Sequence, residues 1–387
     1  MKILYMDWKS YCTEDMIPSF KKAGCQVIRV PFTKELGWKN DEYADMLRTL
    51  IRAERPDFVY SFNFFPLISS VCETEKCTYI SWVYDSPQVA LCNYAANNKC
   101  NLIFLFDKSQ KLYFESKGLK NIYFLPMAAD PKRIEHMKLT NKIRKKYASD
   151  ISFVGSLYTE KKHRFYDRFD GINQYTKGYL DALIEAQLHV YGINFIEKSL
   201  APDIISEMMR VFPMKPNKDG HETPEWLYSE YILNRHVTAR ERGEMLSALS
   251  EKYHVNLYTN DKSWTAGNIN NCGPVDYYDS APFVFKSSLI NLNITLRSIK
   301  SGIPLRAFDI MASKGFLLTS FTSDFLKYFT PNEDFVFYEN KQDLLDKTEY
   351  YLTHKDARLR IAENGYKKIC RDHTFDHRVA EILNLIS

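Results

Sequence analysis

Short apolar runs alternate with helix-like segments along the first 130 residues. Most of these runs are rich in β-branched and aromatic residues, which favour strands, and they are Lys2–Asp7, Gln26–Pro31, Asp57–Asn63, Thr78–Tyr84, Asn101–Phe106 and Asn121–Pro126. Between them apolar residues recur at helical spacing, as in Asp15–Ala23, Asp41–Arg55 and Ser109–Lys117. Strand and helix in alternation predict a parallel sheet covered on both faces. We therefore predict one Rossmann-like domain over residues 1–130.

The same alternation returns after residue 150. A strand running into a glycine turn is expected at Ile151–Leu157, and clearer strands follow at Val255–Thr259, Leu289–Thr295, Phe316–Thr319 and Phe335–Tyr338. Helical spacing is found in Glu241–Tyr253, Tyr277–Ser288, Leu305–Ser313, Leu326–Tyr328 and Lys341–Leu352. This pattern predicts a second Rossmann-like domain over residues 151–370.

Three other segments complete the expected organisation. Residues 131–150 are basic and weakly patterned, which is typical of a linker. Residues 160–250 are mostly helical but interrupted by prolines, so we expect a helical insert in the second domain. Helices at Ala357–Cys370 and His377–Ile386 would close the structure, and we expect the segment 371–387 to pack back toward the N-terminal domain.

Composition and charge exclude several classes of protein. With 387 residues, 45% of them hydrophobic and 26% charged, the chain is typical of a folded protein of two or three domains. A net charge of +4 is too small to indicate a general binder of nucleic acid. The longest uncharged stretch, Phe58–Cys72, has 15 residues and contains Pro66, so no transmembrane segment is expected.

The N-terminus and the cysteines indicate a compartment. The first seven residues already turn polar, so a secretory signal is not expected and we predict a cytoplasmic protein. The 8 cysteines include no C-x-x-C pair. This spacing favours reduced, buried thiols over disulfides or a metal site.

Candidate chemistry is densest between residues 291 and 319, around one strand end and the helix that follows. The polar side chains gathered there are Asn293, Arg297, Arg306 and Asp309. A helix N-terminus presents unpaired N–H groups to an anion, and the two arginines would add planar donors to a diphosphate. Asp309 would be a surface-facing carboxylate that accepts hydrogen bonds from two ribose hydroxyls. The alternative is that Arg306 and Asp309, three residues apart, simply pair with each other.

Two parts of the chain resemble the CgeB-like glycosyltransferases of bacteria. The first part runs from Gly273-Pro-Val-Asp-Tyr-Tyr through Arg306-Ala-Phe-Asp-Ile-Met-Ala-Ser-Lys-Gly to His373-Thr-Phe-Asp-His-Arg, and the second is Ile80-Ser-Trp-Val-Tyr-Asp-Ser-Pro. The resemblance implies the GT-B fold, which is an α/β fold with two Rossmann-like domains facing a central cleft. It also implies a hexosyltransferase that binds a nucleotide sugar, expected to be a UDP-sugar, mainly on its C-terminal domain.

The donor site departs from the wider family in one position. Retaining GT-B families hold the donor with two glutamates eight residues apart, the second on the ribose. Aligned through Asp309-Ile-Met-Ala-Ser, this chain has Asp309 at the second position and Ser301 at the first. The resemblance thus implies ribose recognition by Asp309, and it leaves the anomeric outcome open.

A glycine turn at Gly155-Ser156 matches the turn that opens the donor domain of the same fold, where backbone N–H groups approach phosphate. The basic residue that usually follows this turn is missing. Lys161, Lys162 or Arg164 could replace it, and we favour Arg164 because a guanidinium binds phosphate with two parallel hydrogen bonds.

Asp85 is the candidate catalytic residue. An acceptor hydroxyl loses a proton as it attacks, and a carboxylate at the mouth of the N-terminal domain could receive that proton. The alternative is structural, because Asp-Ser-Pro is good turn chemistry and Asp85 could cap the local backbone. The chain contains no D-x-D triplet, the metal-binding motif of GT-A glycosyltransferases, so a reaction without a metal or other cofactor is expected.

Three functions stay open at this point. The first is a metal-independent transfer of a sugar to an acceptor hydroxyl, on a glycan, a protein or a small molecule. The second is a GT-B-like epimerase acting on the nucleotide sugar, and the third is a non-catalytic nucleotide-sugar binder or coat-assembly protein. No G-x-G-x-x-G follows the first predicted strand, which argues against a nicotinamide dehydrogenase.

Overall fold

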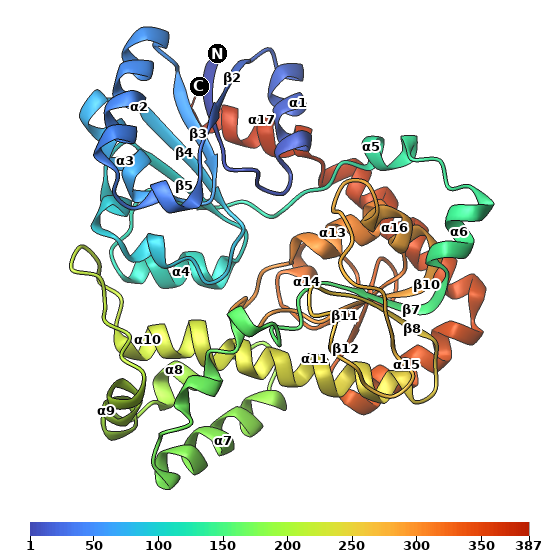
Figure 1. The fold of residues 1–387 in the computed structure, drawn as a ribbon. Coiled ribbons are helices and arrows are strands. Elements are labelled where there is room, and N and C mark those ends of the chain that lie inside the picture. Colours follow the sequence, from blue (N-terminus) through green and yellow to red (C-terminus); the bar gives the residue numbers. More distant parts are fainter. Residues whose placement is uncertain (387) are drawn as a thin grey trace.

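The computed structural model describes residues 1–386 and contains two six-stranded sheets, each with helices on its faces (Figure 1). The strand order is β2-β1-β3-β4-β5-β6 in the first sheet and β12-β11-β10-β7-β8-β9 in the second. Every neighbouring pair is parallel. The predicted α/β class with two Rossmann-like domains is confirmed.

The N-terminal sheet follows the predicted apolar runs closely. Its strands are β1 (Lys2–Asp7), β2 (Gln26–Pro31), β3 (Phe58–Phe62), β4 (Thr78–Val83), β5 (Asn101–Leu105) and β6 (Ile122–Phe124). All five residues of β3 are buried, as expected for a strand covered on both faces. The helices of this domain are α1 (Thr13–Lys22), α2 (Asp41–Glu54), α3 (Pro66–Glu75) and α4 (Lys108–Ser116), with short turns η1 (Lys34–Gly37), η2 (Val89–Cys92) and η3 (Tyr94–Asn97).

Two short helices occupy the stretch between the sheets. They are α5 (Pro131–His136) and α6 (Asn141–Tyr147). Each begins at a side-chain cap, because Asp130 accepts a hydrogen bond from Arg133 N and Thr140 accepts one from Ile143 N. Helices this short leave little periodicity in a sequence, which is why the stretch lacks a clear pattern.

The C-terminal sheet also lies close to its predicted strands, and it gains the two-residue edge strand β9. Its strands are β7 (Ser149–Val154), β8 (Val255–Tyr258), β9 (Asn270–Asn271), β10 (Ser288–Asn293), β11 (Leu317–Ser320) and β12 (Val336–Tyr338). The helices are α12 (Ala281–Ser287), α13 (Leu305–Ala312), α14 (Phe325–Tyr328), α15 (Lys341–Thr353), α16 (Lys355–Asp372) and α17 (Phe375–Ile386). Helix α12 begins four residues after the predicted start at Tyr277, because Asp276 Oδ1 accepts hydrogen bonds from Tyr278 N and Asp279 N and forms a turn there.

A helical layer lies between β7 and β8 in the chain and has an apolar core of its own. It contains η4 (Lys161–His163), η5 (Tyr166–Phe169), α7 (Gln174–Leu188), α8 (Ile196–Ser199), α9 (Pro202–Val211), α10 (Pro224–Leu227), the π-helical turn η6 (Tyr228–Leu233) and α11 (Asn234–Ser250). In Figure 1, α11 runs from this layer to a position below the second sheet. Trp226 and Leu227 of α10 pack in a core cluster of the N-terminal domain, so the layer contacts both domains.

The C-terminal helix returns to the first domain. Figure 1 shows α17 beside α1, and the two helices pack against each other. Phe375 meets the buried ring of Trp82, with the ring centres 6.1 Å apart, and Arg378 donates a hydrogen bond to the carbonyl oxygen of Pro126 (2.8 Å). One apolar cluster therefore extends from the first domain through α17 and α13 into the second.

A buried carboxylate joins the domains on the other side. Asp107, at the end of β5, accepts hydrogen bonds from Lys300 N (2.6 Å), Ser301 N (3.2 Å) and Ser301 Oγ (2.9 Å). A Cβ atom on Gly302 would lie 2.9 Å from both Asp107 Cβ and the Phe106 ring. The glycine is needed because the two domains approach each other closely at this point. We call Asp107 and Ser301 the interdomain latch.

Within residues 1–386, no helix combines the length and the apolar character that crossing a bilayer requires.

Candidate functional site

A cavity of about 640 Å³ lies between the two domains. The N-terminal domain contributes Tyr11 and Asp85 to its wall, and the C-terminal domain contributes Gly155, Arg306 and Asp309. The ends of β7 and β8 and the start of α13 open onto it. Parallel α/β sheets bind ligands outside the carboxyl ends of their strands, so the cavity stands where this fold places a site.

The guanidinium of Arg306 lies against the backbone of Gly155. A Cβ atom on Gly155 would stand 2.3 Å from Arg306 Nη2, so the contact requires glycine. Asn293 Oδ1 accepts a hydrogen bond from Arg306 Nη1 (3.2 Å). Burial, followed by the charge of Arg242, lowers the pKa of Arg306 to about 9. An anion in the cavity would stabilise the charged guanidinium.

The start of α13 faces the same cavity. Pro304 precedes the helix, and among the described residues 1–386 no side chain caps its first N–H groups. Pro304, Leu305 and Arg306 all line the cavity. The helix dipole and its unpaired N–H groups therefore favour a negative charge at the position that Arg306 also faces.

Asp309 lies one turn further along α13 and is buried, with only 6% of its surface exposed. Its Oδ1 accepts a hydrogen bond from the Tyr277 hydroxyl (3.2 Å). Burial, followed by repulsion from Asp15, raises the pKa of Asp309 to about 7. The prediction that Asp309 faces the surface is therefore wrong, because the N-terminal domain packs against α13 and buries this side chain. The expected alternative of an Arg306–Asp309 ion pair is also not found, since Arg306 bonds Asn293 instead.

A second acidic side chain approaches from the other domain. Asp15 on α1 is 1% exposed and forms an ion pair with Arg133, whose Nε lies 2.6 Å from Asp15 Oδ1. Burial raises the pKa of Asp15 to about 6, although Arg133 opposes the shift. Two carboxyl groups from opposite domains are therefore close enough for Asp15 to raise the pKa of Asp309, and Arg133 partly opposes the rise in both pKa values.

Asp85 lies at the opposite wall, just after β4. Its Oδ2 accepts hydrogen bonds from Asn63 Nδ2 (2.8 Å) and Lys34 Nζ (3.1 Å), and 41% of its side chain is exposed. The backbone N–H groups of Tyr84 and Asp85 are capped by Asn63 Oδ1 instead (3.1 and 3.2 Å). The turn is therefore capped by Asn63, and the Asp85 carboxylate remains accessible from the cavity.

Other predicted residues lie in different surroundings. Ser156 lines the cavity, and its hydroxyl donates to the Glu160 carboxylate (2.8 Å). Asn293 is fully buried behind Arg306, so it orients the guanidinium from outside the cavity wall. Arg164 is exposed, its Nε donates to Thr159 O (2.6 Å), and it lines a neighbouring pocket of about 320 Å³.

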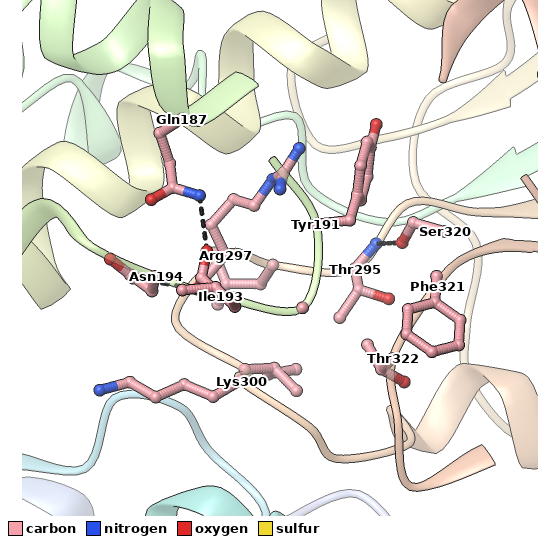
Figure 2. A pocket seen from close by; sticks show the side chains of 13 residues that line it. Gln187, Tyr191, Ile193, Asn194, Thr295, Arg297, Lys300, Ser320, Phe321 and Thr322 are labelled. Carbon is pink, nitrogen blue, oxygen red and sulfur yellow. Dashed lines mark hydrogen bonds between the residues drawn. The ribbon is translucent and has the colours of Figure 1, made fainter. Parts of the chain in front are cut away.

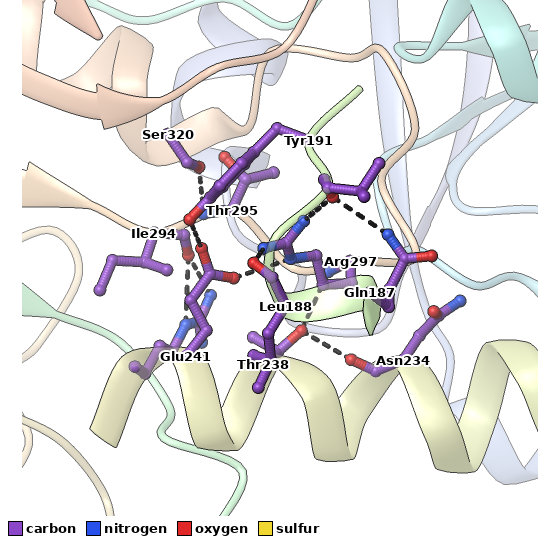
Figure 3. Close-up of polar contacts among 12 residues, drawn as sticks. Gln187, Leu188, Tyr191, Asn234, Thr238, Glu241, Ile294, Thr295, Arg297 and Ser320 are labelled. Atoms are coloured by element: carbon purple, nitrogen blue, oxygen red, sulfur yellow. Dashed lines mark hydrogen bonds and ion pairs between the residues drawn. The ribbon is translucent and has the colours of Figure 1, made fainter. Parts of the chain in front are cut away.

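Arg297 is the predicted residue that lies furthest from this arrangement. Its Nε donates to Glu241 Oε2 (2.8 Å), its Nη1 donates to Val190 O (2.7 Å), and its guanidinium stacks on the ring of Tyr191 (Figure 3). It lines a separate, much smaller cavity of about 30 Å³ (Figure 2). The guanidinium N–H groups of Arg297 thus connect the end of α7 to α11. The structure does not bring Arg297 to the large cavity.

Sequence reasoning missed two residues that shape the site. Tyr158 lines the large cavity just after the glycine turn. Arg242 on α11 is 3% exposed and donates hydrogen bonds to the carbonyl oxygens of Ser156 and Ile294, which holds that turn. Both lie in or beside the helical layer, where the sequence offered no motif. A charged residue at a buried position of a helix is the one signal that could have singled out Arg242.

A family comparison agrees with this reading of the second domain. Residues 240–384 match the model of a family described as glycosyl transferase-like. The match includes α13 with Arg306 and Asp309. No curated protein sequence matches the chain.

Solved glycosyltransferase structures share the fold over the whole chain. Anabaena HepE in complex with UDP-glucose is similar with a TM-score of 0.56 at 9% identity, covering 100% of both chains. Sucrose-phosphate synthase from Thermosynechococcus elongatus has a TM-score of 0.56 at 8% identity, covering 100% of this chain and 98% of the other. A glycosyltransferase from Rickettsia africae reaches 0.50 at 11% identity, covering 100% and 97%. The chain therefore has the GT-B fold.

Proposed function

We propose that the protein is a glycosyltransferase that moves a sugar from a UDP-sugar to an acceptor hydroxyl. The observation that carries the proposal is the shared cavity, which sets Arg306 and Asp309 on one wall and Asp85 on the other. The family match over residues 240–384 supports a glycosyltransferase. The similar HepE structure contains UDP-glucose, which supports uridine diphosphate as the carrier.

The C-terminal wall would hold the donor. Arg306, the first N–H groups of α13 and the backbone of Gly155 would bind the diphosphate. Asp309, three residues after Arg306 on the same helix, would accept hydrogen bonds from the ribose hydroxyls once it is ionised. Asn293 would orient Arg306 through the hydrogen bond to Nη1.

The charged groups on the two walls would promote the transfer of the sugar. Asp85 would receive the proton of the acceptor hydroxyl while the hydroxyl oxygen of the acceptor bonds to the anomeric carbon of the donor. The bond from that carbon to the diphosphate oxygen breaks, and the charge that develops there is met by Arg306 and the dipole of α13. These groups would do what a metal ion does in other transferases, so we propose that no metal is required.

The deciding experiment measures donor binding and turnover with UDP-glucose. UDP at about 100 times its dissociation constant should raise the stability by about 2.7 kcal/mol, which a thermal melt detects. Release of UDP from UDP-glucose should continue in the presence of EDTA. Absence of any stabilisation by UDP would contradict the proposed donor site, and loss of turnover with EDTA would contradict the metal-independent step.

A further inference from the structure

Tyr11 lies in the turn between β1 and α1, and it lines the large cavity from the side of the N-terminal domain. The residue is 57% exposed. In the part of the chain that the structure describes, residues 1–386, its hydroxyl has no hydrogen-bond partner. A tyrosine presents an apolar ring and a polar tip, which suits it to contacts with a bound molecule. The Tyr11 hydroxyl is therefore free to bond a ligand in the cavity.

The turn that carries Tyr11 has an unusual backbone. Lys9 and Cys12 have φ angles of 59° and 70°, in the left-handed region that residues other than glycine rarely adopt. Lys9 N donates a hydrogen bond to Asp7 Oδ1 (2.9 Å), which helps to hold this conformation. Such backbone conformations persist only where the surrounding structure fixes them, and they are concentrated at ligand-binding and active sites. The turn thus holds Tyr11 at the cavity wall in a fixed conformation.

Contacts with the second domain determine where Tyr11 stands in the cavity. Its ring centre lies 5.1 Å from the ring centre of Tyr277. The neighbouring Cys12 Sγ lies 3.6 Å from the Tyr277 hydroxyl, and the same hydroxyl donates a hydrogen bond to Asp309 Oδ1. The turn of the N-terminal domain therefore packs beside the carboxyl group that would bind the ribose.

Tyr11 also lies near Arg306, which would bind the diphosphate. Burial lowers the pKa of Arg306, and the Tyr11 hydroxyl is close enough to oppose part of this shift. Both residues line the same cavity. A guanidinium and a phenol hydroxyl are both donors, so together they can bind one anion from two sides. A phosphate oxygen is a stronger acceptor than a ribose hydroxyl because it carries charge.

We propose that the Tyr11 hydroxyl donates a hydrogen bond to the diphosphate of the donor, so that both domains bind this group. The inference rests on the proposed function and adds a substrate-binding residue from the N-terminal domain. Tyr11 keeps its proton, and no covalent step is involved. Arg306 and α13 would hold the diphosphate from the C-terminal wall, and Tyr11 would hold it from the N-terminal wall.

The test compares the binding of UDP and of uridine to wild-type protein and to Tyr11→Phe by calorimetric titration. Phenylalanine keeps the ring and its packing on Tyr277, so only the hydroxyl is removed. The affinity for UDP should fall by about tenfold, as expected for the loss of a hydrogen bond to a charged group. Uridine has the ribose and the base but no phosphate, so its affinity should stay within about twofold of the wild-type value.

Tyr94→Phe is the matched control, because Tyr94 is also 57% exposed and belongs to η3 of the same domain. This variant should bind UDP like the wild type. An unchanged affinity for UDP in Tyr11→Phe would overturn the proposal. Equal losses of UDP and uridine affinity would overturn it too, because the hydroxyl would then act on the ribose or the base. If the wild-type protein binds no UDP, the proposed donor site is contradicted, and this inference with it.

Discussion

At the scale of single residues, burial changes what the predicted side chains can do. Asp309 lies under the N-terminal domain, and the desolvation that follows raises its pKa to about 7. Asp85 keeps an exposed carboxylate because Asn63 takes over the capping of its turn. Neither outcome follows from local sequence, since each depends on a segment remote in the chain.

The ionisation of Asp309 should control donor affinity. The carboxylate accepts hydroxyl hydrogen bonds more strongly than the protonated acid does, so the affinity for UDP-glucose should rise with pH up to about 7 and then level off. Below pH 7, affinity should fall by up to about tenfold per pH unit. Asp309→Asn, which resembles the protonated form, should keep the fold, bind weakly and lose this pH step. Calorimetric titrations from pH 5 to 9 measure it, and an unchanged step in the variant would remove Asp309 from the site.

Asp85 should be needed for transfer and not for donor binding. Asp85→Asn removes the proton acceptor, so kcat should fall by about 100-fold or more while UDP-glucose affinity stays within about twofold. Asp45→Asn is a control on the surface of the same domain, with 75% of that side chain exposed. Full activity in Asp85→Asn would dismiss it as the base.

At the scale of elements, periodicity predicted most strands and helices because each buries one face or both against a layer. The exceptions have physical causes. Helix α3 begins within the uncharged, largely apolar stretch Phe58–Cys72, where a buried helix and a buried strand look alike. Arg306 and Asp309 reach the same cavity because they share one helix, whereas Arg297 lies away from it because its partners come from the end of α7 and from α11.

The glycine turn after β7 should tolerate no side chain. In Gly155→Ala the added methyl would displace the Arg306 guanidinium, so UDP affinity should fall by about tenfold or more. Gly178→Ala on α7 is the matched control, because within residues 1–386 nothing beyond its chain neighbours and its own helix backbone lies within 4 Å of its Cβ position. That control should gain about 0.5–1 kcal/mol of stability and keep its UDP affinity. Wild-type affinity in Gly155→Ala would show that Arg306 does not bind the diphosphate.

At the scale of the whole molecule, the interdomain latch gives Ser301 a role in contact between the domains. The Ser301 hydroxyl contacts both Asp107 (2.9 Å) and Asp324 (3.1 Å). The position therefore serves contact between the domains. A sequence motif within one domain cannot reveal that Ser301 forms a hydrogen bond with Asp107 of the other domain.

A glutamate at position 301 should destabilise the protein. Ser301→Glu would bury a third carboxylate beside Asp107 and Asp324, so the free energy of unfolding should fall by about 3 kcal/mol or more with no gain in donor affinity. Ser301→Ala, which only loses hydrogen bonds, should cost about 1–2 kcal/mol. Urea unfolding of both variants measures the difference, and a stable Ser301→Glu that binds donor more tightly would refute the role of the latch.

The apolar cluster that continues through α17 and α13 should make the two domains unfold together. Two Rossmann-like domains with separate cores would melt in two steps, whereas a shared core makes the loss of one domain expose the other. We expect a single calorimetric transition whose van't Hoff and calorimetric enthalpies agree, and two resolved transitions would contradict this. Cooperativity across the cleft means that a ligand bound on one wall stabilises both halves of the protein at once.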